Sequence, residues 1–195
     1  MEEPNSRSDA PAVEGSTAGE IVAFWRDAGR KAWFTKNEVF DEAIRARFET
    51  AHHAAARGEL ASWVETAEGA LALILLTDQF PRQMWRGSAH AFATDPLARA
   101  TAREAIPRGH HRATAPDLRG FFYLPFQHSE DPDDHEFGLN LAEALEREGG
   151  ESARWARHHR DIIERFGRFP HRNGVLGRRN TLDEQAFLDD GGFAG

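Results

Sequence analysis

The stretch GALALILLTDQF (residues 69–80) decides the fold. Every position from Ala70 to Leu76 is apolar, so a helix formed here has no polar face to present to water. We therefore expect this helix to lie in the centre of the core. Asp78 comes directly after the apolar run, and the Phe-Pro step at Pro81 is a common way to end a helix. The sequence thus predicts a central helix with a carboxylate at its end.

The segments on either side of this stretch have the period of amphipathic helices. Residues such as Asn37, Asp131 and Thr181 stand where helix N-caps are expected, and Thr181 is followed by Glu184 at the spacing of a capping box. No segment alternates as a strand would, so the predicted fold class is all-α. The expected helical segments are 20–29, 37–58, 94–109, 116–126, 130–150, 152–168 and 180–192.

Composition excludes several functional classes. The formal net charge is -8, which argues against a general binder of nucleic acid or anionic membranes. There is no cysteine, so disulfides and thiolate chemistry are excluded. No apolar run is long enough to cross a bilayer, and the first residues lack the pattern of a signal peptide, so we expect a cytoplasmic protein. Residues 1–18 are predicted to form a disordered tail, and residues 19–195 a single all-helical domain.

A second stretch repeats the pattern of the first. The segments LILLTDQFPRQ (residues 73–83) and IIERFGRFPHR (residues 162–172) can be aligned so that Pro81 meets Pro170. In each segment an aliphatic run leads into Phe-Pro and then into basic residues. Two similar helix ends would bring two sets of donors to one cavity, although the frequent use of Phe-Pro to stop helices explains the similarity equally well.

Several motifs carry a resemblance to a known family. They include DQFPRQMW (residues 78–85), FFYLPFQHSED (residues 121–131) and HRDIIERFGRFPHRNGVLGR (residues 159–178). With these motifs the chain resembles a bacterial family of proteins of unknown function. The resemblance implies a tetratricopeptide-repeat-like fold of stacked antiparallel helical hairpins, and it implies no activity. Gln83 stands where the family usually has Asn, and His135 where Gln is usual.

The carboxylate at the end of the central helix needs a partner. A buried carboxylate costs several kcal/mol unless it is paired with a cation or hydrogen-bonded. Arg82, four residues after Asp78, and Arg172 from the second stretch are the expected partners. These three residues form either a buried clamp that holds two helix ends or a site where one guanidinium faces a cavity and binds a carboxylate or phosphate in a bidentate manner.

The turns after the proline steps hold histidines and carboxylates. His128, Glu130 and His171 are candidates for acid-base catalysis, while Glu130 is equally suited to capping the helix that follows. Their spacing matches no metal motif, so no metal is predicted. His159 lies on the apolar face of its helix, where a hydrogen-bonded core histidine is the usual explanation.

Two functional hypotheses follow. The first is a small anionic ligand, a carboxylate or phosphate, bound in an interhelical pocket by Asp78, Arg82, Arg172 and Asn173, with the protein acting as a binding protein or an enzyme. The second is a tetratricopeptide-like scaffold for a protein or peptide partner. Chemically rich residues cluster at loops after proline steps, which favours the pocket. The sequence names no cofactor.

Overall fold

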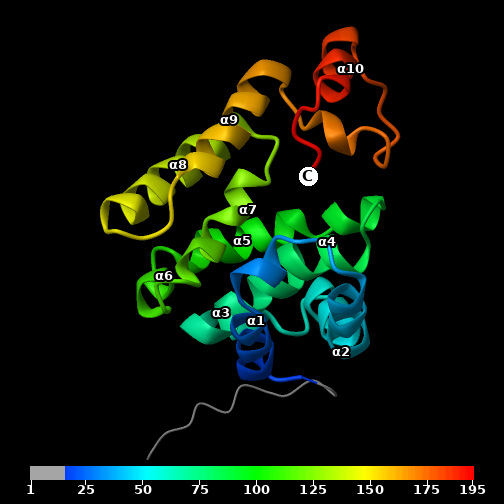
Figure 1. The fold of residues 1–195 in the computed structure, drawn as a ribbon. Helices are drawn as coiled ribbons and strands as arrows, with labels where there is room; N and C mark the ends of the chain where they lie inside the picture. Colours follow the sequence, from blue (N-terminus) through cyan, green and yellow to red (C-terminus); the bar gives the residue numbers. More distant parts are fainter. Residues whose placement is uncertain (1–15) are drawn as a thin grey trace, which may run out of the picture.

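The computed structural model describes residues 16–195, and every regular element in that range is helical (Figure 1). The predicted all-α class is confirmed for this part of the chain. The tail predicted for residues 1–18 falls mostly on residues 1–15, which lie outside the described residues. The α-helices are α1 (Ala18–Trp33), α2 (Glu38–Ala56), α3 (Ala67–Ile74), α4 (Phe80–Met84), α5 (Asp95–Ala105), α6 (His110–Ala113), α7 (Leu124–Gln127), α8 (Pro132–Arg147), α9 (Arg154–Phe166) and α10 (Leu182–Asp189).

Shorter segments connect these helices. Leu75–Gln79 (η2) is a π-helical turn. The 3-10 segments are η1 (Ala61–Glu65), η3 (Ala89–Phe92), η4 (Arg119–Phe122) and η5 (Pro170–Arg172). None of the helices in residues 16–195 is long and apolar enough to span a membrane.

The predicted N-caps are confirmed. The side chain of Asn37 accepts hydrogen bonds from the backbone of α2, and Asp131 does the same for α8. Thr181 and Glu184 form the capping box of α10. The predicted helix break at Gly29 is confirmed: Gly29 has φ +74° and ψ 169°, outside the helical region, and a second short helical segment follows this kink and ends at Trp33.

The central helix lies where the apolar run predicts. Residues 70–76 are all buried, and α3 packs against α1 on one side and α5 on another (Figure 1). Large aromatic side chains complete the core around it, among them Trp25, Phe48 and Phe80. Because the residues of this run have no polar face, other helices cover them on all sides.

The expected helix end at Phe80 does not occur. The chain makes a π turn at Leu75–Gln79, closed by a hydrogen bond from the amide of Phe80 to the carbonyl of Leu75, and then continues as α4. Pro81 has no N–H, so the carbonyl of Thr77, four residues earlier, loses its usual helical partner. Side chains replace such lost bonds: the hydroxyl of Thr94 donates to Thr77 O at 2.7 Å.

The carbonyls on either side of Thr77 are also bound by side chains. His52 Nδ1 donates to Leu76 O at 2.8 Å, and Arg82 Nη1 donates to Asp78 O at 2.5 Å. A π turn and a proline thus release carbonyl groups that bring α2, α4 and the start of α5 together. Thr94 directly precedes α5, where a threonine is a typical N-cap, but its side chain makes no capping hydrogen bond to this helix.

The second Phe-Pro segment does end its helix. Gly167 adopts φ +69° directly after α9, which terminates the helix before Phe169 and Pro170. Phe169 then packs with Ile162 and Ile163 in a separate apolar cluster. The helices α8 and α9 lie side by side, and the α10 segment lies beyond the end of α9 (Figure 1).

Candidate functional site

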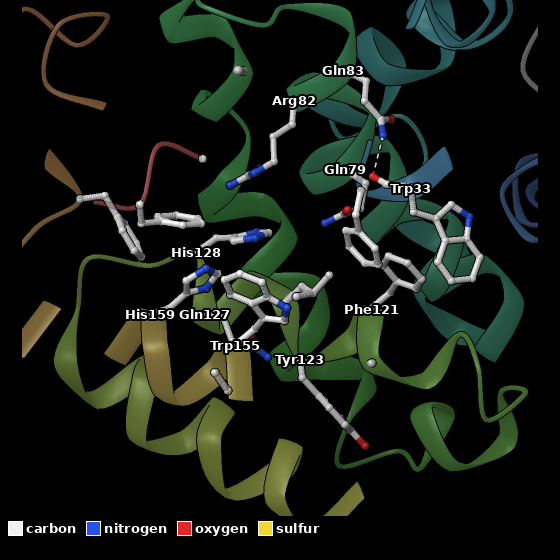
Figure 2. A pocket seen from close by; sticks show the side chains of 18 of the residues that line it. Trp33, Gln79, Arg82, Gln83, Phe121, Tyr123, Gln127, His128, Trp155 and His159 are labelled. Carbon is white, nitrogen blue, oxygen red and sulfur yellow. Dashed lines mark hydrogen bonds between the residues drawn. The ribbon is translucent and has the colours of Figure 1, made fainter. Parts of the chain in front are cut away.

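A cavity of about 820 Å³ lies between the α1–α4 side of the molecule and the α8–α10 side (Figure 2). Four of the predicted site residues line it: Arg82, His128, His171 and Arg172. The ends of both Phe-Pro segments and the turn at His128 therefore meet at one cavity, as the aligned segments predict. Aromatic and apolar side chains make up much of the remaining wall, including Trp33, Phe121, Tyr123, Leu124, Trp155, Phe169 and Phe193.

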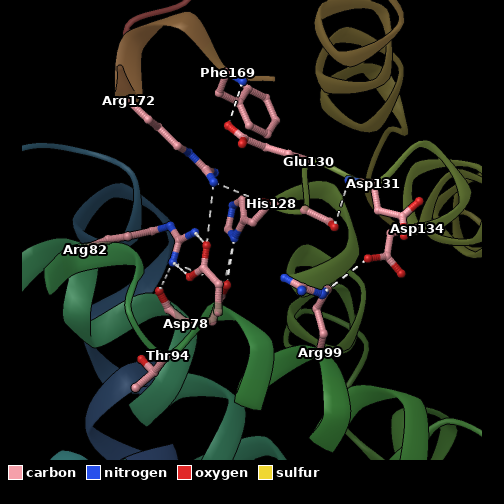
Figure 3. Close-up of polar contacts among 12 residues, drawn as sticks. Asp78, Arg82, Thr94, Arg99, His128, Glu130, Asp131, Asp134, Phe169 and Arg172 are labelled. Carbon is pink, nitrogen blue, oxygen red and sulfur yellow. Dashed lines mark hydrogen bonds and ion pairs between the residues drawn. The ribbon is translucent and has the colours of Figure 1, made fainter. Parts of the chain in front are cut away.

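Asp78 lies behind the cavity wall. Its side chain is fully buried and does not line the cavity, so the ligand contact predicted for it is not made in this arrangement. His128 Nδ1 lies 2.8 Å from Oδ1 of Asp78, Gln79 Nε2 donates to Oδ2 at 2.5 Å, and Arg82 Nη1 lies 3.4 Å from Oδ1 (Figure 3). Burial alone would raise the pKa of Asp78. The charges of Arg82 and His128 outweigh burial and hold this pKa well below its usual range.

Arg82 has a second carboxylate partner that the sequence analysis did not identify. Its Nη1 and Nη2 donate to Oδ1 and Oδ2 of Asp95, both at 2.9 Å. Asp95 is buried in the first turn of α5. The signal that could have found it is a carboxylate beside a proline at a helix start, a position that also suits a buried ion pair.

Arg172 lies next to this network and is only partly paired. The predicted contact with Asp78 is not formed, because His128 occupies that position. Arg172 Nη1 instead donates to the carbonyl of His128 at 2.9 Å and lies 3.7 Å from Oδ2 of Asp95 (Figure 3). Its guanidinium carbon lies 4.4 Å from the ring centre of Phe169, a cation–π contact. Burial first, and then the charge of Arg82, lower the pKa of Arg172 to about 10.

His128 is arranged as half of a carboxylate–histidine pair. Because the carboxylate of Asp78 accepts, Nδ1 carries the proton and the lone pair of the neutral ring lies on Nε2. Burial and the nearby charge of Arg82 lower the pKa of His128, while Asp78 opposes them. Since His128 lines the cavity, the geometry provides an oriented base beside two guanidinium groups.

Glu130 and Asn173 lie outside the residues that line the cavity. Both oxygens of Glu130 accept from Arg178, at 2.6 and 2.9 Å, and Oε1 also accepts from the amide of Phe169. The side-chain oxygen of Asn173 accepts from Arg178 Nε, and its amide donates to Asn180. The lone pairs of Glu130 thus hold the loop after α9, and Glu130 does not cap the following helix, because Asp131 is the N-cap of α8.

Two histidines on the α9 side lack hydrogen-bond partners. His159 is buried, and neither of its ring nitrogens has a partner within residues 16–195, contrary to the expected hydrogen-bonded core histidine. Nδ1 of His171 and Nε of Arg172 are likewise unpartnered in the described chain. Burial, reinforced by neighbouring cations and histidines, lowers the pKa of His159 to about 2 and that of His171 to about 3.

Residues 16–195 form an all-helical fold with a cavity that combines aromatic walls with arginine and histidine side chains. The chain belongs to the family described as bacterial protein of unknown function (DUF924), whose model matches residues 21–192. It is similar to a solved protein of unknown function from Agrobacterium tumefaciens, with 53% sequence identity and a TM-score of 0.85. That similarity covers 89% of this chain and 97% of the other. No curated protein matches the chain.

Proposed function

We propose that the chain binds a small molecule with an anionic head, a carboxylate or a phosphate, and an apolar body. One observation carries the proposal: the unpartnered nitrogens of Arg172, His159 and His171 all belong to residues that line the aromatic cavity. Buried polar atoms without partners are rare in folded proteins, and a site for a bound ligand or water is a common reason for them. Oxygen atoms of a bound anion would supply the missing acceptors.

The unpartnered groups surround one side chain, Phe169. The ring of His159 lies 5.7 Å from it between centroids and that of His171 lies 5.6 Å away, while the guanidinium of Arg172 stacks on the same ring. A single small ligand over Phe169 is therefore within reach of all three. Its charge would also offset the mutual repulsion of Arg82 and Arg172, which lowers the pKa of Arg172.

Thermal unfolding with defined probes tests this function. Inorganic phosphate, phenyl phosphate and benzoate should raise the Tm, and the two aromatic probes should act at lower concentration because they also fill the apolar part of the cavity. Arg172→Lys keeps the positive charge but loses the guanidinium that can bind an anion in a bidentate manner, so most of the ligand-induced rise in Tm should disappear. Arg179→Lys changes an exposed arginine of the same loop and should leave the shift intact.

The contrary result is equally specific. If none of the probes raises the Tm of the parent chain, and Arg172→Lys lowers the Tm without ligand, then the arginines only hold the fold together.

Acid-base catalysis on the bound anion is a second candidate, and the Asp78–His128 pair is the observation that favours it. With its lone pair on Nε2, His128 can remove a proton from water or substrate, and His171 is another histidine in the cavity wall. The hydrolysis rates of p-nitrophenyl phosphate and p-nitrophenyl acetate measure this catalytic activity. His128→Gln should abolish turnover while the phosphate-induced rise in Tm persists.

The alternative is a tetratricopeptide-like scaffold for a protein or peptide. Scaffolds of that type spread recognition over exposed helix faces. Here the unpartnered groups are buried and belong to residues that line a single concave cavity, which suits a small ligand better.

A further inference from the structure

We propose a second, separate site: His52, His53 and His90 bind one divalent transition-metal ion of the zinc class. One ring nitrogen from each histidine lies within 4.8 Å of those of the other two. None of the three lines the cavity. The first two histidines stand near the C-terminal end of α2, and the third lies in η3.

The π turn described above prepares His52 for this role. The carbonyl of Leu76 can only accept, so the 2.8 Å contact places the proton of His52 on Nδ1 and leaves the lone pair on Nε2. A metal-binding histidine almost always donates its other ring nitrogen to a carbonyl or carboxylate in this way, which fixes the tautomer and the orientation of the ring. His52 is also buried, so its position is set before a metal arrives.

The other two histidines are free to adjust. In a tetrahedral zinc site with Zn–N bonds of about 2.0–2.1 Å, the ligand nitrogens lie about 3.3 Å apart. His90 is exposed and the side chain of His53 is 43% exposed, so both can move inward by the small distance required. Trp85 stacks on His90 with centroids 4.1 Å apart and forms an apolar wall beside the rings.

The chemistry of the ligands restricts the ion. Three neutral imidazoles suit zinc, copper and nickel rather than calcium or magnesium, which prefer oxygen. A fourth position is open to water or to Glu49, whose Oε1 lies 3.9 Å from His53 Nε2. The metal would fasten the end of α2 to η3, two segments that no disulfide can join because the chain has no cysteine.

Zinc titration of the tag-free full chain tests the site. Isothermal calorimetry should show one zinc per chain, zinc should raise the Tm, and cobalt in place of zinc should give the visible absorption of a four-coordinate ion. His90→Ala and His53→Ala alter exposed side chains, so both variants should fold, as circular dichroism would verify. Each should weaken zinc binding by at least about tenfold, the lower end of the loss caused by removing even an outer partner of a metal ligand.

Two control variants locate the ion. His158→Ala removes a half-buried histidine elsewhere in the chain, and His171→Ala removes a histidine of the cavity. Both should bind zinc as the parent does. Absence of stoichiometric zinc binding in the parent chain would overturn the proposal. So would unchanged affinity in His90→Ala or His53→Ala, or loss of zinc in His171→Ala.

Discussion

The two Phe-Pro segments have similar sequences and different structures. In the first, the helix passes through the π turn and Pro81 into α4; in the second, α9 ends before Pro170. When the prolines are aligned, Asp78 meets Gly167. Asp78 keeps helical backbone and pairs with Arg82 and His128, whereas Gly167 takes φ +69°, which other residues rarely adopt. One position therefore decides whether the helix continues.

The segments also differ in how their polar groups are satisfied. Around Asp78 the carboxylates and carbonyls have hydrogen-bond partners, so this region stabilises the folded state. Around Pro170, Nδ1 of His171 and Nε of Arg172 are buried and have no partner within residues 16–195, although both residues line the cavity. The polar groups of the first segment are thus satisfied within the fold, whereas some of those in the second are not.

The largest expected effect is acid unfolding driven by the histidines near the second segment. An unfolded histidine takes up a proton near pH 6.5, but His159 and His171 in the folded chain do so only near pH 2 and 3. Between these values the unfolded state binds more protons, so stability falls as the pH falls below about 6.5, by up to about 1.4 kcal/mol per pH unit for each histidine. Urea unfolding at several pH values between 7 and 4 measures this.

A single substitution isolates one contribution. His159→Leu removes a buried histidine and keeps an apolar side chain, so the dependence of stability on pH should become shallower while stability at pH 7 is retained. A slope identical to that of the parent chain would contradict the assigned burial of His159 as a neutral ring.

The next effect concerns the first segment. Asp78→Ala leaves Arg82 and His128 buried without their shared partner, and it should cost about 3 kcal/mol or more of unfolding free energy. Glu130→Ala is the matched change near the second segment: its ion pair with Arg178 keeps 25–28% of the side-chain surface exposed, so solvent screens it and the loss should be about 1 kcal/mol. Chemical denaturation at pH 7 compares the two. Equal losses would mean that the two carboxylates contribute alike.

A smaller effect tests the carbonyl released by Pro81. Thr94→Val keeps the shape of the side chain but leaves the buried carbonyl of Thr77 without a donor, at a cost of about 1–3 kcal/mol. In a Pro81→Ala background residue 81 regains an N–H four residues after Thr77, and Thr94→Val should then cost less. A double-mutant cycle measures this coupling; strictly additive losses would show that Pro81 does not create the need for Thr94.

The smallest effect tests the helix end at Gly167. Gly167→Ala forces a side chain into left-handed backbone and should cost about 1 kcal/mol. Gly174→Ala is the control, because Gly174 does not have this conformation and a Cβ there meets open space. Chemical unfolding should give free energies of unfolding for the two variants that differ by about that amount.

The sequence by itself determined the class of fold and several element boundaries. The apolar run of residues 70–76 can be satisfied only at the centre of a core, and the caps Asn37, Asp131 and Thr181 act within a few residues of the chain. The sequence suggested a shared cavity for Arg82, His128, His171 and Arg172 but left open whether the two Phe-Pro segments are only helix stops; that these residues line one cavity is seen only after folding.

Tertiary structure alone decided how these groups pair. Asp95 reaches Arg82, and His128 displaces Arg172 from Asp78; no local sequence signal says which partner each of these charged groups takes. Glu130 forms its ion pair with Arg178, which lies far along the chain from it. Helix caps and apolar periods are short-range effects that a sequence displays, whereas the partner of a buried charge depends on which distant segment lies within a few ångströms of it after folding.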